Sequence, residues 1–334
     1  MRNSQSKEAM FYEKLEGGRV RCQLCPHYCQ IAVGKSGICR GRENKDGTLN
    51  ASTFAETISL TNDPVEKKPL YHFYPGRFLL SMGPNACNLS CEHCQNWEIS
   101  QARAATSHVT PERAVELAEN TRDCIGLSFT YTEPLMWFEF VLETSRLARS
   151  KGVKTTLVTN GFINSEPAAE LLPFIDAINL DIKSMDDDFY RSICGARLQP
   201  VLDFATQAAK TSHLEITNLV IPGLNDEPGQ IQRLADWICD NLGDETALHF
   251  SRYFPRYKMR RPETPIETLV AAHKIAREKL KFVYVGNVID DELHNTYCPS
   301  CGNLLVRRTG YRIGITGLSD GKCTKCGESI PIVT

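Results

Sequence analysis

The stretch RFLLSMGPNACNLSCEHCQNW, residues 77–97, joins an apolar run to three closely spaced cysteines. The apolar residues 78–83 are typical of a buried strand, and the proline and asparagine that follow favour its end. Cys87, Cys91 and Cys94 come next in a C-x3-C-x2-C pattern, with no fourth cysteine close behind. Because zinc and iron–sulfur sites usually take four ligands from the chain, these three cysteines, the trio, predict a metal site with one position free for another ligand.

Strand-like and helix-like segments alternate from residue 77 to residue 290. Segments such as 111–122 and 227–243 have apolar residues three and four apart, as amphipathic helices do. Regular alternation predicts a parallel sheet with crossover helices, either an open doubly wound sheet or a full or partial barrel. The trio then lies in the first strand-to-helix loop, at the sheet edge where ligands bind. The expected strands are 78–83, 126–131, 154–160, 177–182, 214–221, 247–253 and 282–287.

Eleven of the 14 cysteines fall into three groups at ligand-like spacing. Besides the trio there is an N-terminal quartet and a C-terminal quartet. The N-terminal quartet is Cys22, Cys25, Cys29 and Cys39, and the C-terminal quartet is Cys298, Cys301, Cys323 and Cys326. Disulfides would explain such groups in a small secreted domain, but the N-terminus has no apolar core of the kind found in secretion signals. We therefore predict metal binding in a reducing, cytoplasmic compartment.

Charge and hydropathy exclude two classes of partner. The formal net charge is −2, which gives no indication of a polyanion as the main partner. No apolar run in the sequence is long enough to span a bilayer, so we expect no membrane association.

The trio also has a plainer interpretation as a closed zinc site with His93 as the fourth ligand. His93 occupies one of the two positions between Cys91 and Cys94. Reaching the same ion as both neighbours would be sterically awkward, so the site with one open position is favoured.

A C-x3-C-x2-C trio in the first loop of an alternating α/β chain resembles the radical S-adenosylmethionine (radical SAM) superfamily, particularly its branch of pyruvate formate-lyase activating enzymes. The resemblance implies a partial (β/α)6 barrel. It implies that Cys87, Cys91 and Cys94 hold a [4Fe–4S] cluster whose fourth iron is chelated by S-adenosylmethionine. Reductive cleavage of that cofactor generates a 5′-deoxyadenosyl radical, which abstracts a hydrogen atom from the substrate.

The stretch TYTEP, residues 130–134, matches a second family motif, a glycine-glycine-glutamate stretch that holds the amino group of the cofactor. Glu133 stands at the position of the acid. Tyr131 and Thr132 depart from the two glycines, so the resemblance implies a less close backbone approach here, with the Thr132 hydroxyl as a substitute contact.

Two later strand ends match the family as well. VTNG at 158–161 places Asn160 near the cofactor, and LDIK at 180–183 places Asp181 and Lys183 there. Taken alone, the charged pair has a plainer interpretation as a solvated ion pair. The agreement of these positions with the trio, in strand order, favours the cofactor site.

Both ends of the chain look like small segments that fold around metal. The C-terminal quartet forms two C-x2-C-G knuckles separated by twenty-one residues, which resembles a zinc ribbon. The N-terminal quartet fits zinc or an auxiliary iron–sulfur cluster, with His27 as an alternative ligand. Structural zinc is favoured there, because the segment shows no long apolar run to shield a cluster from water.

The complete order of motifs resembles the radical SAM member of the AmmeMemoRadiSam group, and this likeness covers nearly the whole chain. It implies partners from the Memo and AMMECR families, and the superfamily implies an electron donor such as flavodoxin or ferredoxin. We expect an N-terminal metal-binding segment at 1–50, a lead-in at 51–76, the radical SAM barrel at 77–290 and a zinc ribbon at 291–334.

The substrate is less clearly indicated. Residues 249–262, HFSRYFPRYKMRRP, interleave basic and aromatic side chains that suit nucleic acid, although a solvated loop is the favoured interpretation. Cys194 is a candidate hydrogen-atom donor or simply a small buried side chain. The main hypothesis is an oxidoreductase that activates a protein partner. The alternatives are radical modification of RNA or a small molecule, and a non-catalytic metal-stapled scaffold.

Overall fold

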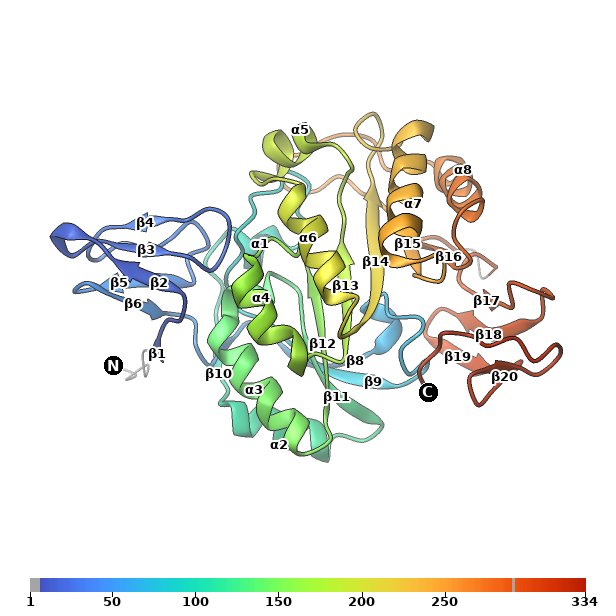
Figure 1. Ribbon diagram of the computed structural model, residues 1–334, viewed down its shortest axis with the longest axis horizontal. Coiled ribbons are helices and arrows are strands. Elements are labelled where there is room, and N and C mark those ends of the chain that lie inside the picture. Colours follow the sequence, from blue (N-terminus) through green and yellow to red (C-terminus); the bar gives the residue numbers. More distant parts are fainter. Residues whose placement is uncertain (1–6, 290–291) are drawn as a thin grey trace.

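Eight strands form one sheet in the centre of the molecule (Figure 1). The computed structural model describes residues 7–289 and 292–334. The sheet strands are β8 (Leu60–Pro64), β9 (Phe78–Met82), β11 (Cys124–Phe129), β12 (Lys154–Thr159), β13 (Ala177–Asp181), β14 (His213–Val220), β15 (Leu248–Arg252) and β16 (Val283–Gly286). Seven of them, β9 and β11 to β16, are parallel, and β8 pairs antiparallel with β9.

The strand order distinguishes the two architectures that the sequence left open. Along the sheet the order is β16-β15-β14-β13-β12-β11-β9-β8, so each new strand is added on the same side of the previous one. A doubly wound sheet would reverse direction part-way. The predicted partial barrel and its seven strand segments are therefore confirmed, with one parallel strand more than the expected six and the antiparallel β8 at the edge.

The helices begin and end where the sequence provides the usual signals. Helix α2 starts at Pro111, after Thr110, whose hydroxyl accepts a hydrogen bond from the backbone N–H of Arg113. Gly152 follows α3 with φ of 72°, in the left-handed region that favours glycine after a helix. The longer helices are α2 (Pro111–Asn120), α3 (Phe138–Ser150), α4 (Ser165–Leu171), α6 (Gln199–Ala208), α7 (Pro228–Leu242) and α8 (Ile266–Arg277).

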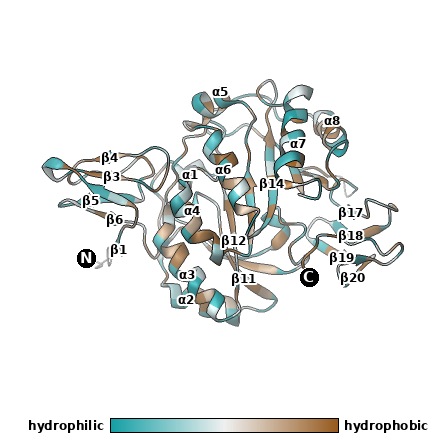
Figure 2. Ribbon diagram, viewed as in Figure 1, coloured by the Kyte–Doolittle hydropathy of each residue, from teal (hydrophilic) through white to brown (hydrophobic). Residues whose placement is uncertain are grey.

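Short helical turns complete the connections: η2 (Val65–Lys67), α1 (Trp97–Ser100), η3 (Pro134–Trp137), η4 (Leu172–Phe174), α5 (Asp187–Phe189) and the π-helical turn η5 (Tyr190–Cys194). In Figure 1 the helices α3, α4, α6 and α7 lie in front of the strands. Helices such as α3 and α7 carry both hydrophobic and hydrophilic stretches (Figure 2), as expected for helices with one face on a core. Within the described residues, no helix combines the length and the apolar character needed to span a membrane.

The N-terminal appendage consists of two small antiparallel sheets, ordered β1-β6-β5 and β2-β3-β4. Their strands are β1 (Lys7–Glu8), β2 (Tyr12–Lys14), β3 (Val20–Cys22), β4 (Gln30–Ile31), β5 (Arg42–Lys45) and β6 (Thr48–Ala51), with the turn η1 (Glu16–Gly18). A further pair, β7 (Glu56–Thr57) and β10 (Ser107–His108), lies between this appendage and the barrel. Backbone N–H of Asn164, beyond the end of β12, donates to the carbonyl of Leu24 (3.1 Å). The appendage therefore docks at the carboxyl edge of the barrel strands.

The C-terminal appendage lies at the opposite end of the molecule (Figure 1). Its strands are β17 (Thr296–Tyr297), β18 (Leu304–Thr309), β19 (Arg312–Ile315), β20 (Leu318–Ser319) and β21 (Lys322–Cys323). Leu305 and Val306 share one buried cluster with Ala247 and Phe282, which directly precede β15 and β16. This appendage therefore docks at the amino edge of the barrel strands.

A buried carboxylate joins the lead-in to that amino edge. Glu215 on β14 accepts hydrogen bonds from the backbone N–H groups of Tyr71 (3.0 Å) and His72 (2.7 Å) and contacts His213 (3.0 Å) and His249 (2.7 Å). Burial opposes its charge, but the hydrogen bonds from the two histidine side chains hold the pKa of Glu215 well below its usual range.

Candidate metal and cofactor site

The loop after β9 leaves the sheet in close contact with the neighbouring strand end. A Cβ atom added to Gly83 would lie 2.1 Å from the carbonyl oxygen of Thr130, so only glycine fits at this position. The loop is then held by Asn85, whose side-chain amide donates to the carbonyls of Ile99 (2.5 Å) and Ala102 (2.9 Å). These contacts fix the loop that carries the trio at the carboxyl edge of the barrel.

The three cysteines of the trio lie close together without converging on a single point. Cys91 is buried, and Cys87 and Cys94 are half-buried. Among the described residues, the three sulfur atoms do not all lie within 4.8 Å of one another, a limit that the C-terminal quartet meets. Four ligands around one zinc ion are closer than that, because Zn–S bonds are only about 2.3 Å long. The trio is therefore not gathered as tightly as the ligands of a single zinc ion.

Cys194 lies beside the trio, which the sequence did not indicate. Ligand atoms of Cys91, His93 and Cys194 all lie within 4.8 Å of one another. Burial, with a smaller effect of the Lys183 ammonium, lowers the pKa of His93 to about 3, so its imidazole is neutral. This buried group is a competing three-ligand arrangement that shares only Cys91 with the trio.

The proximity of Cys194 follows from the π-helical turn η5, where the chain returns to the trio loop. The backbone N–H groups of Ser90 and Glu92 donate to the carbonyls of Cys194 (2.9 Å) and Ile193 (3.0 Å). A turn of this type has no clear sequence signature, so the pairing was visible only in three dimensions.

Glu133 is placed next to the end of β12. Its buried carboxylate accepts hydrogen bonds from the backbone N–H groups of Leu135 (3.0 Å) and Asn160 (2.8 Å) and from the hydroxyl of Thr159 (2.6 Å). Burial raises the pKa of Glu133 to about 7, although these donors act in the opposite direction. The Asn160 amide nitrogen lies 4.0 Å from the sulfur of Cys87. Cys87, Glu133 and Asn160, which were predicted from separate motifs, therefore lie next to one another.

The two residues that replace the family glycines have different environments. Tyr131 has φ of 76°, the left-handed conformation that favours glycine, and its hydroxyl donates to Asp63 (2.6 Å). The Thr132 hydroxyl donates to the carbonyl of Pro84 (2.6 Å), which leaves it acceptor capacity only. Tyr131 therefore keeps a backbone shape typical of glycine at a functional position, at a cost of about 1–3 kcal/mol.

Asp181 and Lys183 form an ion pair at the end of β13, with 3.1 Å between the Lys183 Nζ and an Asp181 carboxylate oxygen. The backbone N–H of Lys183 donates to the hydroxyl of Tyr190 in η5 (3.0 Å). Lys183 also lies close enough to Cys91 and His93 to affect their titration. The predicted pair is thus on the trio's side of the barrel.

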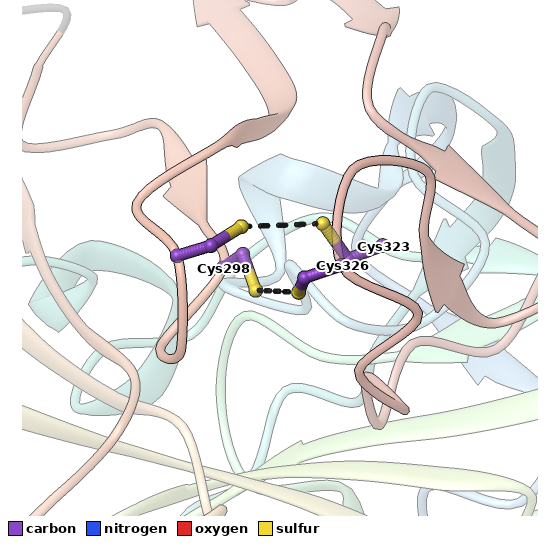
Figure 3. A group of neighbouring side chains, drawn as sticks. Cys298, Cys323 and Cys326 are labelled. Carbon is purple, nitrogen blue, oxygen red and sulfur yellow. Dashed lines mark hydrogen bonds between the residues drawn. The ribbon is translucent and has the colours of Figure 1, made fainter.

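The C-terminal quartet converges tightly. All four sulfurs lie within 4.8 Å of one another, with 3.5 Å between Cys298 and Cys326 and 3.7 Å between Cys301 and Cys323 (Figure 3). This is the size of a tetrahedral site for one zinc ion.

The N-terminal quartet lines a single cavity under the appendage. Cys22, Cys25 and Cys39 are buried and Cys29 is half-buried. Apolar side chains also line the cavity, including Met136 from the barrel. The sequence suggested that no apolar shell would surround this quartet. The structure differs, because the barrel supplies part of that shell.

The basic and aromatic stretch 249–262 is partly used in internal contacts. Arg252 pairs with Glu263 (2.9 Å), and Arg261 donates to the carbonyl of Pro222 (2.9 Å). Tyr257 stacks on Trp97, with ring centroids 5.4 Å apart and planes at 13°. A cavity of about 470 Å³ lies nearby, lined by Gln95, Trp97, Glu98, Phe254, Arg256 and Asn287.

Comparison with known proteins supports one superfamily. Residues 83–237 match the Radical SAM superfamily. An uncharacterized protein of Methanocaldococcus jannaschii is 45% identical over 335 residues, which cover 98% of this chain and 99% of that protein. The pyruvate formate-lyase 1-activating enzyme of Escherichia coli K12 is 28% identical over 162 residues, which cover 46% of this chain and 65% of the enzyme. This chain belongs to the radical SAM superfamily.

Radical SAM membership implies a [4Fe–4S] cluster and S-adenosylmethionine as cofactors. Among solved structures, Streptococcus suis SuiB bound to S-adenosylmethionine is similar with a TM-score of 0.49 and 16% identity, over 60% of this chain and 48% of that one. A domain of a pyruvate-formate lyase-activating enzyme from Bacteroides vulgatus is similar with a TM-score of 0.43 and 20% identity, over 48% of this chain and 99% of that domain.

Proposed function

We propose that this radical SAM protein is an enzyme whose trio, Cys87, Cys91 and Cys94, holds the [4Fe–4S] cluster, with S-adenosylmethionine bound at the ends of β11, β12 and β13. The observation that carries the proposal is the meeting of the trio loop, Glu133 and Asn160 at the carboxyl edge of the barrel. When bound, the cluster and S-adenosylmethionine supply reductive cleavage of the C5′–S bond and a radical that takes a hydrogen atom from substrate.

The chain's own residues bind and orient the cofactor. Glu133 uses three acceptor positions within the protein, so about one of the four in a carboxylate is left for an ammonium group. Thr132 offers its hydroxyl oxygen as an acceptor, and Asn160 has its amide near Cys87. We assign the Asp181–Lys183 pair to the polar part of the cofactor on the other side of the trio.

Activation of a protein partner is the reaction that the similarity to pyruvate formate-lyase 1-activating enzyme favours. The proposal includes a flavodoxin or ferredoxin as electron donor and Memo-family and AMMECR-family proteins as companions in the cytoplasm. A second candidate is modification of a nucleotide or RNA. The stacked Trp97 and Tyr257 and the nearby Arg256 favour it, because planar and anionic groups suit such a cavity.

Anaerobic reconstitution tests the cluster assignment. The wild-type chain, given S-adenosylmethionine and reductant, is expected to release 5′-deoxyadenosine. Replacing Cys87, Cys91 or Cys94 by alanine is expected to abolish this release, because each removes one of three ligands of the same cluster. The matched control is Cys194→Ala, which removes a neighbouring thiol and is expected to keep the cleavage.

A single ion bound by Cys91, His93 and Cys194 would give a different pattern of metal loss among the cysteine variants. If Cys91, His93 and Cys194 held a single ion, Cys194→Ala would lose metal while Cys87→Ala kept it, and that result would overturn the assignment. For the substrate, transfer of deuterium from labelled candidates into 5′-deoxyadenosine identifies whose hydrogen is taken. Transfer from a nucleotide and not from a protein partner would replace the first candidate reaction by the second.

A further inference from the structure

The N-terminal quartet is more widely spaced than a site for one ion. Among the described residues, the sulfurs of the C-terminal quartet all lie within 4.8 Å of one another, whereas no three sulfurs of the N-terminal quartet do. The N-terminal sulfurs nevertheless line the same cavity. Zn–S bonds of about 2.3 Å would draw them as close as the C-terminal ones. In this respect the N-terminal quartet resembles the trio.

A buried cation faces this cavity. Arg42 is 1% exposed, lines the cavity and has a terminal nitrogen 4.0 Å from the sulfur of Cys22. Its other contacts are an ion pair with Glu139 (2.5 Å) and a hydrogen bond to the carbonyl of Met10 (2.6 Å), and its Nε has no hydrogen-bond partner. Arg42 is paired with Glu139, and its Nη1 also places a buried N–H donor beside the sulfur of Cys22, where it suits a thiolate that ligates an anionic group.

The surroundings of the cavity suit a cluster. Leu24 and Ile31 come from the appendage and Met136 from the barrel, and all three are buried. Apolar side chains limit access of water to a cluster and thereby affect its reduction potential.

The cavity also borders the trio directly. Asn88, the residue after Cys87, lines the cavity together with Cys25. The carbonyl of Asn88 contacts His27 (2.8 Å), and its side-chain oxygen accepts from Asn160 (3.1 Å). The residue that follows Cys87 therefore forms part of the wall of the cavity that the N-terminal quartet lines.

We propose that Cys22, Cys25, Cys29 and Cys39 hold a second [4Fe–4S] cluster, which exchanges electrons with the trio's cluster through the contact at Asn88. The presence of this cluster is independent of the proposed function, and only its electron-transfer role rests on it. In that role one electron leaves the N-terminal cluster and reduces the trio's cluster, with no bond formed or broken. A reduced low-potential one-electron carrier protein then restores the N-terminal cluster.

The decisive experiment uses the full-length chain without the trio. The variant Cys87→Ser/Cys91→Ser/Cys94→Ser is reconstituted anaerobically with iron, sulfide and zinc. It is expected to bind about four iron and four sulfide and to give the electron paramagnetic resonance signal of a reduced [4Fe–4S] cluster, against about eight iron in the wild type. One additional zinc and no sulfide-bound iron in this variant would overturn the proposal.

A variant that keeps the trio but lacks two cysteines of the N-terminal quartet tests whether the second cluster lies at that quartet. Cys25→Ser/Cys39→Ser is expected to keep about four iron, all in the trio. In the fully reduced wild type, the two neighbouring paramagnets are expected to broaden each other's signals relative to the two variants. Unbroadened signals equal to the sum of the two variants would overturn the contact at Asn88. Loss of 5′-deoxyadenosine release with both clusters intact would count against the proposed function alone.

Discussion

The two cysteine quartets have the same number of ligands but dock at opposite edges of the barrel. The N-terminal quartet lies at the carboxyl edge of the strands, next to the trio, and its sulfurs surround a cavity. The C-terminal quartet lies at the amino edge, and its sulfurs are 3.5–3.7 Å apart in the closest pairs. In barrels of this type the carboxyl edge carries the chemistry and the opposite edge contributes stability. The difference teaches that a count of cysteines does not decide the kind of site; the spacing and the surroundings do.

The largest effect is expected from removing the C-terminal site. Cys298→Ser/Cys323→Ser should lose about one zinc per chain, and with it a local folding free energy on the order of 10 kcal/mol, because a closed four-thiolate site drives the folding of its segment. Metal analysis and limited proteolysis within 292–334 measure both effects.

The iron content should not change in that variant, which separates the two quartets. Cys239→Ser, outside all three cysteine groups, is the control and should retain zinc and protease resistance. Retention of zinc by the double variant, or a fall in iron, would contradict the assignment of a separate zinc site at the amino edge.

A smaller effect is expected at the buried ion pair beside the N-terminal quartet. Arg42→Met leaves the Glu139 carboxylate buried without its cation and should lower the free energy of unfolding by about 3–5 kcal/mol. Arg42→Met/Glu139→Gln should recover much of this loss, because the amide keeps an acceptor for the backbone N–H of Met10 without the charge. Denaturant unfolding of the reconstituted chains gives the two values.

The same substitutions test the role of Arg42 near the cluster. Removal of a nearby cation should lower the reduction potential of the N-terminal cluster, measured in the chain that lacks the trio. Equal stability of the single and double variants, with an unchanged potential, would show that Arg42 acts on neither Glu139 nor the cavity.

The smallest effect concerns the contact of the C-terminal appendage with the lead-in. His72 is 1% exposed, with its ring nitrogens 2.6 Å from the Tyr284 hydroxyl and 3.2 Å from the Pro331 carbonyl. Burial lowers the pKa of His72 to about 3, while the unfolded chain binds a proton below about pH 6.5. The unfolded state therefore binds more protons between these values, and stability falls as the pH is lowered through 6.5. From pH 7 to pH 5 the loss is about 2 kcal/mol.

The charged neighbours of His72 do not reverse this fall in stability at lower pH. Glu215 stays ionised well below its usual range and contacts His213 and His249, so its contribution is lost only at lower pH. Proteolysis of the C-terminal appendage from pH 7 to pH 5 should therefore increase in the wild type and change less in His72→Gln. An equal pH dependence in both chains would contradict this assignment.

Much of the fold could be predicted from local sequence. The seven parallel strands coincide with apolar runs between helix and turn signals, and the trio follows the first of them. The antiparallel β8 was not predicted, because LTNDP at 60–64 lacks the apolar pattern of a buried strand. Its place depends on pairing with β9, which is a long-range contact.

The candidate site was predicted in part. Glu133 and Asn160 lie where strand order suggests, because the carboxyl ends of parallel strands share one edge. Cys194 beside Cys91 and Arg42 beside Cys22 were not predicted as neighbours. Each is brought to its cysteine by the tertiary fold, so the intervening sequence contains no periodic signal for the contact.

The sequence by itself determined the ligand types, the alternation of strands and helices and the superfamily, since these depend on residue identity and local spacing. Only the tertiary structure decided which quartet docks beside the trio and how far apart its sulfurs lie. The physical reason is that ligand spacing depends on how an appendage packs against the barrel. Met136 and Asn88 belong to the barrel, yet they form the walls of the N-terminal cavity.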